Sequence, residues 1–229
     1  MLNNINPYNR TEFEIAFKTS NLYDKLSNDF DEIHFDPLWT LWDNGTTRQH
    51  LGDKKLQKTR FNAVCFYYLN FLLKESPKEI YDLGCGWNIF KKYIPSVIGL
   101  GAEDPNSEWF FGDIHDFVDN DYVAGHQHFF ESVFAINSLH FFPLREIRKR
   151  VLDFASMIKP SGKGYLALNL QRLLDFDPEK FAELGTAVRI EQYIRTELDN
   201  MPFNYEVFEL DTSRYDSGLD GNIRMVIKV

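Results

Sequence analysis

Apolar residues in the first 75 positions recur at helical spacing. Thr11 and Glu14 have the reciprocal arrangement of a capping box, and the helix that they begin carries on one face Ile15, Leu22 and Leu26. A second helix is predicted near 56–74, from the helical spacing of Phe61, Val64, Tyr68 and Leu72. The segment between them is rich in turn residues, so residues 1–75 are expected to form a helical cap or lid.

From residue 76 onward the pattern changes to short apolar runs that alternate with helical stretches. The runs are EIYDL, SVIGLG, EWFFGD, FESVFAINSL and GYLALNL. Such alternation predicts a mainly parallel sheet that helices cover on both faces. The clearest helix follows Pro143 and has on one face Leu144, Ile147, Val151, Phe154 and Ile158. The turn residues of KPSGKG are expected to end this helix, and another helix is predicted over 187–199.

The last two runs, NYEVFEL and NIRMVIKV, alternate apolar and polar residues across a long loop. This alternation fits an antiparallel edge pair better than a buried parallel strand. The sequence therefore predicts an α/β fold: a three-layer sandwich whose seven-stranded, mainly parallel sheet ends in an antiparallel edge pair. This domain is expected to span 76–229, after the N-terminal helical cap of residues 1–75.

Composition narrows the class of protein. A chain of 229 residues with 44% hydrophobic residues can bury a substantial core. The net charge of −9 argues against broad nucleic-acid binding, which leaves a basic footprint. The start of the chain does not have the basic-then-apolar pattern of a secretory signal, and the apolar run AVCFYYLNFLL is too short to cross a bilayer. We therefore expect a cytoplasmic protein that is not in a membrane.

The stretch YDLGCGWN places glycines directly behind an apolar run and before a short helix expected from about Asn88. A ligand, a neighbouring helix or the turn geometry alone could each require them, because glycine lets backbone approach closely. In an open parallel sheet, ligands bind beyond the carboxyl ends of the strands. A glycine turn that leads into a helix at that edge suits a nucleotide-like ligand.

Several stretches in chain order resemble the motifs of class I S-adenosylmethionine-dependent methyltransferases, which have a Rossmann-like fold. YDLGCGWN resembles the first motif, an acidic residue followed by alternating glycines. The later stretches, in order, are VIGLGAEDP, FFGDIHDF, FESVFAINSLHFF and MIKPSGKGYLALN. They resemble the second, third and fourth strands, and then the helix, turn and fifth strand that follow. The resemblance covers roughly Lys78 to Val229.

The resemblance implies a set of residues that bind S-adenosylmethionine and its product, S-adenosylhomocysteine. Asp82 would meet the cationic amino group of the methionine part, most often through water. Gly84 and Gly86 would let backbone approach the ligand. Asn88 stands where the family has a third glycine, and asparagine accepts left-handed backbone better than most residues.

The adenosine part would bind at the ends of the second and third strands. Asp113 would accept a hydrogen bond from the adenine amino group, and Ile114 could offer its backbone beside the ring. The ribose-binding carboxylate is expected about where Gly101 stands, and the nearest acidic residues are Glu103 and Asp104. Glu103 is the first candidate for the ribose and Asp104 the alternative.

The methyl acceptor is expected beside the fourth strand, where Asn137, Ser138 and His140 follow in sequence. Methyl transfer needs in-line placement and, for a weakly acidic hydroxyl or amine, a general base. Asn137 and His140 are the candidate catalytic residues. His140 is the candidate general base, because histidine titrates near neutrality. The alternative for His140 is an ordinary hydrogen-bonded histidine. In the lid, Trp39 and Trp42 either limit the acceptor pocket or anchor the lid on the core.

The sequence thus predicts methyl transfer from S-adenosylmethionine to an unidentified acceptor, expected to be a small molecule methylated on oxygen or nitrogen. One alternative is a binding protein that keeps the fold without the cofactor. A NAD-dependent oxidoreductase is a more distant alternative, because Ile89 stands where the dinucleotide motif needs a small residue. No metal site is predicted, since the pair His126 and His128 lies in a polar loop without obvious partner ligands. The sequence does not indicate an oligomeric state.

Overall fold

The computed structural model describes residues 10–30, 32–35, 60–74, 78–85, 89–100, 120–136, 138–139, 142–211 and 224–229. Its centre is a sheet of six described strands in the order β4-β3-β5-β6-β8-β7. The strands are β3 (Ile80–Leu83), β4 (Val97–Leu100), β5 (Phe130–Ile136), β6 (Ile158–Asn169), β7 (Glu206–Asp211) and β8 (Arg224–Lys228). Strands β4, β3, β5 and β6 are parallel, whereas β8 is antiparallel to both β6 and β7.

This sheet confirms the predicted α/β fold and the antiparallel edge pair. Each of the runs EIYDL, SVIGLG, FESVFAINSL and GYLALNL contributes one of the parallel strands. The seventh predicted strand, in EWFFGD, lies outside the described residues. The six strands therefore account for every predicted strand that the structure describes.

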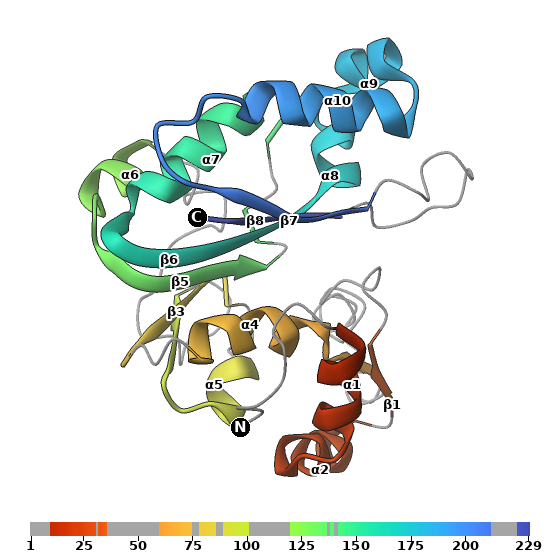
Figure 1. The fold of residues 1–229 in the computed structure, drawn as a ribbon, viewed down its shortest axis with the longest axis vertical. Helices are drawn as coiled ribbons and strands as arrows, with labels where there is room; N and C mark the ends of the chain where they lie inside the picture. The colour runs from red at the N-terminus through yellow and green to blue at the C-terminus, as the bar shows by residue number, and fades with distance from the viewer. Residues whose placement is uncertain are drawn as a thin grey trace, which may run out of the picture.

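Helices cover both faces of the sheet and make three layers (Figure 1). One face carries α4 (Val64–Lys74) and α5 (Ile89–Tyr93). The other carries α6 (Asn120–Gly125), the short 3-10 helix η4 (Leu144–Glu146), α7 (Ile147–Ser156), α8 (Leu170–Asp175), α9 (Pro178–Leu184) and α10 (Ala187–Leu198). Helix α10 begins and ends within one residue of the prediction, with Thr186 as its N-cap.

Two apolar clusters fill the spaces between the layers. Along β5, Val133 and Ala135 belong to the cluster beneath α7, and Phe134 and Ile136 belong to the cluster beneath α4. Successive side chains of a strand point to opposite faces, so β5 is buried on both sides. Its sequence is a near-continuous apolar run for this reason, as expected of a central parallel strand.

The N-terminal helices differ from the prediction in where they start and which face they bury. Helix α1 (Arg10–Lys18) already includes Arg10, so Thr11 lies inside it rather than at its cap. The second helix α2 (Asn21–Asp29) is separate and has Ser20 as its N-cap. Ile15 therefore does not share a helix with Leu22 and Leu26 as predicted, and it is 63% exposed. The buried residues of α1 are Phe13 and Phe17, which lie one turn apart on another face.

Two predicted boundaries are also wrong. The helix predicted near 56–74 starts at Val64, because residues 60–62 form β2 (Arg60–Asn62) and pair in parallel with β1 (Glu32–His34). The segment KPSGKG does not end the helix that precedes it: α7 ends at Ser156, and KPSGKG is part of β6. The register of β6 against β5 shifts there, so turn residues build a bulge instead of a loop.

The helices of the predicted cap share their core with the sheet. Phe17 packs on Phe66 of α4 with 5.5 Å between ring centroids, and Phe66 packs in turn on Phe90 of α5. Phe90 contacts Phe134 of the sheet at 5.3 Å. This chain of rings runs from α1 to the sheet, while the division of the chain at residue 75 stays a prediction.

Replacing Phe17 by alanine should lower the free energy of unfolding by about 3–5 kcal/mol, because the side chain is fully buried in this ring cluster. Ile15→Ala in the same helix should change it by no more than about 0.5 kcal/mol, since Ile15 is exposed. Urea unfolding followed by circular dichroism measures both. Equal losses for the two variants would contradict the assignment of the buried face.

Candidate functional site

The order of the strands reverses at β3. From β3 the chain passes to β4 on one side of it, and then to β5 on the other side. In open parallel sheets such a reversal leaves a crevice at the carboxyl ends of the two neighbouring strands, where ligands bind. The carboxyl ends of β3 and β5 are therefore the place to look for a site, and the predicted glycine turn directly follows β3.

The glycine turn is fixed by hydrogen bonds to the end of β4. The amides of Gly84 and Cys85 both donate to the carbonyl of Leu100, at 2.7 and 3.1 Å. Gly84 has a φ of 75°, which lies in the left-handed region where a side chain is disfavoured. The backbone of the turn therefore requires a glycine at this position.

Ser138 ties the same turn to the segment after β5. Its side chain is buried, and its hydroxyl donates a hydrogen bond of 2.5 Å to the carbonyl of Leu83. The sequence places Ser138 among the three candidates after the fourth strand, together with Asn137 and His140. The structure gives it a positioning role, because its hydrogen bond joins the two strand ends that border the crevice.

Asp82 is the exceptional residue of the site. It is 3% exposed, and one of its carboxylate oxygens has no hydrogen-bond partner within the described part of the chain. It stands between Gly99 of β4 and Phe134 of β5 in the sheet register. Burial raises the pKa of the Asp82 carboxyl well above its usual range, because the charged form loses its hydration.

A buried carboxylate oxygen without a partner costs free energy, and proteins seldom leave one unexplained. The cost falls when a cation or a hydrogen-bond donor reaches the oxygen. Since Asp82 lies directly before the glycine turn, a ligand in the crevice is a natural source of such a group. The buried oxygen of Asp82 therefore fits a ligand that brings a cationic amino group to it.

The other predicted site residues lie outside the described residues. These are Gly86, Asn88, Glu103, Asp113, Ile114, Asn137 and His140. The alternative ribose residue, Asp104, and both lid tryptophans also lie outside them. Their roles stay predictions, and the structure brings together Asp82, Gly84 and Ser138 at the crevice.

The histidine pair lies at the opposite edge of the sheet, before β5. The ring of His126 stacks on Phe130 at 6.2 Å with an interplanar angle of 7°. Nδ1 of His128 lies 3.2 Å from the carbonyl oxygen of Ile158. Within the described ranges, no three side chains of the metal-binding types come together. Packing and hydrogen bonding account for both histidines.

One contact of the helix that follows the glycine turn could not be predicted from the sequence. The hydroxyl of Tyr93 donates to the carboxylate of Asp29, and Lys92 Nζ lies 2.9 Å from the same carboxylate. Tyr93 and Asp29 are 64 residues apart in the chain. This contact fastens α2 to α5, the helix after the glycine turn, and burial together with the neighbouring carboxylate raises the pKa of Tyr93.

No protein-family model matches the sequence, and no curated protein matches it significantly. Among solved structures, the chain is similar to a SAM-dependent methyltransferase from Anabaena variabilis, with 15% identity, coverage of 93% of this chain and 94% of that one, and a TM-score of 0.42. A SAM-dependent methyltransferase from Archaeoglobus fulgidus has 12% identity, coverage of 72% and 90%, and a TM-score of 0.39. The YcgJ protein from Bacillus subtilis has 12% identity, coverage of 71% and 97%, and a TM-score of 0.40.

Similarity at this level does not assign a function to this chain.

None of the helices within the described residues is both long and apolar enough to cross a membrane.

The raised pKa of Asp82 predicts how stability depends on pH without ligand. An unfolded aspartate loses its proton near pH 4, whereas native Asp82 keeps it to a higher pH. Above about pH 4 the native state therefore binds more protons than the unfolded state, and its stability falls until the raised native pKa is passed. The slope from this one group is at most about 1.4 kcal/mol per pH unit.

Asp82→Asn should remove this decline, since asparagine does not titrate. Denaturant unfolding of both proteins between pH 4 and pH 8 measures the difference. The variant should gain stability relative to the parent protein as the pH rises. A difference that stays constant over the whole range would show that Asp82 does not titrate as its burial requires.

Proposed function

We propose that this protein transfers a methyl group from S-adenosylmethionine to a small acceptor, on oxygen or nitrogen. The observation that carries the proposal is the buried Asp82 carboxylate, two residues before Gly84 at the strand-order reversal, with one oxygen that has no partner among the described residues. The resemblance of YDLGCGWN to the first methyltransferase motif supports it independently of the geometry.

The crevice beside Asp82 and Gly84 suits the methionine end of the cofactor. A cationic amino group, directly or through a water molecule, would satisfy the oxygen of Asp82 and favour its ionised form. Gly84 would let the backbone of the turn approach the ligand, and Ser138 would hold the turn in place. Bound S-adenosylmethionine supplies an electrophilic methyl group on a sulfonium centre.

By the resemblance, the rest of the cofactor would contact residues further along the chain. Gly86 and Asn88 would continue the turn, Glu103 or Asp104 would bind the ribose, and Asp113 with the backbone of Ile114 would bind the adenine. On the acceptor side, Ser138 brings the segment after β5 to the glycine turn. Its neighbours Asn137 and His140 are therefore proposed to face the acceptor, His140 as the general base.

The net charge of the chain supports the proposal of a small acceptor. The chain has a net charge of −9 and lacks the basic footprint that duplex binding requires, which favours a small acceptor. The main alternative is a binding protein that has the fold without the reaction. It would be favoured if the crevice held no cofactor.

Calorimetry with S-adenosylhomocysteine tests cofactor binding. Gly84→Ala should weaken binding at least about tenfold, because the added methyl group strains a turn with a φ of 75° beside the crevice. Gly185→Ala is the matched control: Gly185 has a φ of 67° but caps the C-terminus of α9. The control should lose stability without losing affinity. Equal losses of affinity, or binding of NAD instead, would overturn the proposal.

His140→Ala and Asn137→Ala should each reduce turnover of an acceptor and leave cofactor affinity within about threefold, a change under ~1 kcal/mol. To identify the acceptor, the protein is incubated with labelled S-adenosylmethionine and a metabolite extract. Mass spectrometry then detects the labelled product. Should His140→Ala keep full activity and lower only the melting temperature, His140 is structural. The general base would then have to come from another segment.

A further inference from the structure

Asp82 lies on the face of the sheet that α4 and α5 cover. Its register partners are Gly99 of β4 and Phe134 of β5, and Phe134 belongs to the apolar cluster on this face. Phe90 of α5 contacts Phe134, and Phe66 of α4 contacts Phe90. A carboxylate among such groups loses its hydration without compensation, so the ligand-free protein favours the carboxyl group with its proton.

The titratable side chains of the described elements around Asp82 do not offset this cost. They are Tyr67 and Lys74 on α4, Lys91, Lys92 and Tyr93 on α5, and Cys85 in the glycine turn, since Tyr81 of β3 packs on the opposite face. Within the described residues, none of these side chains bonds to the buried oxygen of Asp82. Lys92 and Tyr93 contact Asp29 instead. Burial is therefore the cause of the raised pKa of Asp82.

A ligand with an ammonium group changes this balance, because an opposite charge beside a carboxyl group favours its ionised form. We propose that binding of the cofactor displaces the proton of Asp82 into the solvent, so that the carboxylate and the ammonium group become an ion pair in the act of binding. The O–H bond of the carboxyl group breaks, its proton passes to the buffer, and the ammonium group keeps its three protons. The inference rests on the proposed function, because the cofactor brings the ammonium group.

The proton is released by binding and not by methyl transfer. Asp82 stays ionised throughout the reaction, since S-adenosylmethionine and its product have the same amino group. The titration of Asp82 should therefore appear in kcat/KM for the cofactor, which reports the free protein, and not in kcat, which reports the bound state. A general base on the acceptor side, proposed as His140, would appear in kcat.

Proton release makes affinity depend on pH. The pKa of Asp82 is raised in the free protein and lowered again by the bound ammonium group, so binding releases a proton between these two values. In this window the affinity for S-adenosylhomocysteine should rise with pH, by up to about tenfold per pH unit. It should level off once the pH passes the raised pKa of the free protein.

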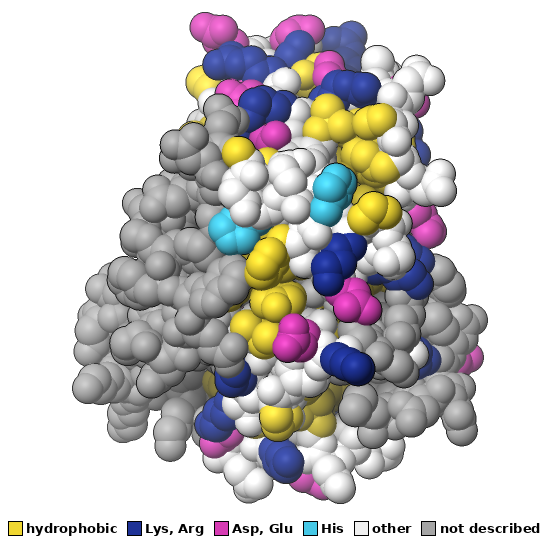
Figure 2. Space-filling view, turned by 90° about the vertical axis from the view of Figure 1, so that its left-hand side faces the viewer, with side chains coloured by type: hydrophobic (Ala, Val, Ile, Leu, Met, Phe, Trp, Pro, Cys, Tyr) yellow, Lys and Arg dark blue, Asp and Glu magenta, His cyan; other side chains and the backbone are white. Residues whose placement is uncertain are grey.

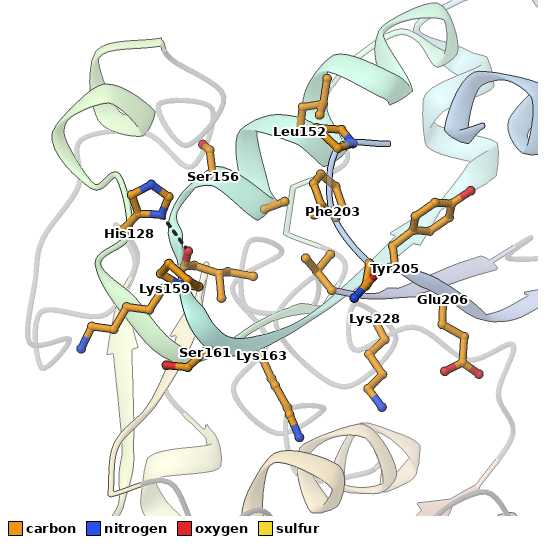
Figure 3. Close-up of a pocket in the computed structure, with 17 residues that line it drawn as sticks. His128, Leu152, Ser156, Lys159, Ser161, Lys163, Phe203, Tyr205, Glu206 and Lys228 are labelled. Carbon is orange, nitrogen blue, oxygen red and sulfur yellow. Dashed lines mark hydrogen bonds between the residues drawn. The ribbon is translucent and has the colours of Figure 1, made fainter. Parts of the chain in front are cut away.

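A second cavity provides a control, because a ligand bound there would not displace the proton of Asp82. It has a volume of about 810 Å³, lies at the opposite edge of the sheet from the crevice, and is lined in part by His128 (Figure 3). Histidine and hydrophobic side chains lie together on this face of the molecule (Figure 2). Since imidazole groups also exchange protons in the physiological range, the experiment must separate the two places.

Calorimetry of the complete protein in acetate and in MES buffer counts the released protons, because the two buffers take up a proton with different heats. At about pH 5.5 the α-amino group of the ligand is an ammonium group. S-adenosylhomocysteine should release up to one proton, seen as unequal heats in the two buffers. The matched probe is its deamino analogue, in which hydrogen replaces the amino group. The analogue should bind more weakly and with equal heats.

Two variants assign the proton. Asp82→Asn should bind S-adenosylhomocysteine with equal heats in both buffers, because asparagine has no proton to lose. His128→Gln should release as much as the parent protein. If Asp82→Asn does not fold, the comparison of the two ligands on the parent protein decides.

The inference is overturned, and the proposed function kept, if the parent protein binds S-adenosylhomocysteine with equal heats in both buffers. It is also overturned if the deamino analogue or Asp82→Asn releases the same proton, or if His128→Gln abolishes the release. A parent protein that does not bind S-adenosylhomocysteine at all would overturn the proposed function and this inference together.

Discussion

The burial of β3 and β5 between two apolar clusters is the constraint on which the rest of the structure depends. Because both faces of these strands are covered, any side chain at their ends is cut off from water unless the crevice admits it. Leu83 satisfies this constraint simply by packing in the core. Asp82 does not, and its carboxylate is held in a place where ionisation is unfavourable unless a partner arrives.

The backbone around Asp82 is fixed before any ligand binds. On one side, the carbonyl of Leu100 accepts hydrogen bonds from two backbone amides of the glycine turn. On the other side, the hydroxyl of Ser138 donates a hydrogen bond to the carbonyl of Leu83. The aromatic chain from Phe17 through Phe66 and Phe90 supports the same region from below. A turn held in this way loses little further freedom on binding, which favours affinity for a ligand that fits it.

Much of the sheet could be predicted because a strand covered on both faces must be a short apolar run, as FESVFAINSL is. Periodicity alone could not choose between faces of α1, since it does not reveal that Phe13 and Phe17 meet other rings. It also missed β2, whose pairing partner β1 lies far back in the chain. In KPSGKG the same turn residues that end helices also permit a bulge.

The sequence predicts where the site lies in the sheet, but not which groups surround Asp82. The motif marks Asp82 and Gly84. That one oxygen of Asp82 finds no partner among the described residues depends instead on what α4, α5 and the neighbouring strands bury around it. The role of Ser138 depends on a hydrogen bond to a residue 55 positions earlier. Local sequence contains neither fact, because both arise from the order of strands in the sheet.

A crystal structure of the protein with S-adenosylhomocysteine would show whether the crevice binds the cofactor. We expect density for the ligand at the carboxyl ends of β3 and β5, with its amino group within hydrogen-bond reach of Asp82 or of a water bound to it. We also expect that the hydrogen bond from Ser138 to Leu83 is retained. Ligand density elsewhere, or an empty crevice at saturating ligand concentration, would contradict the account.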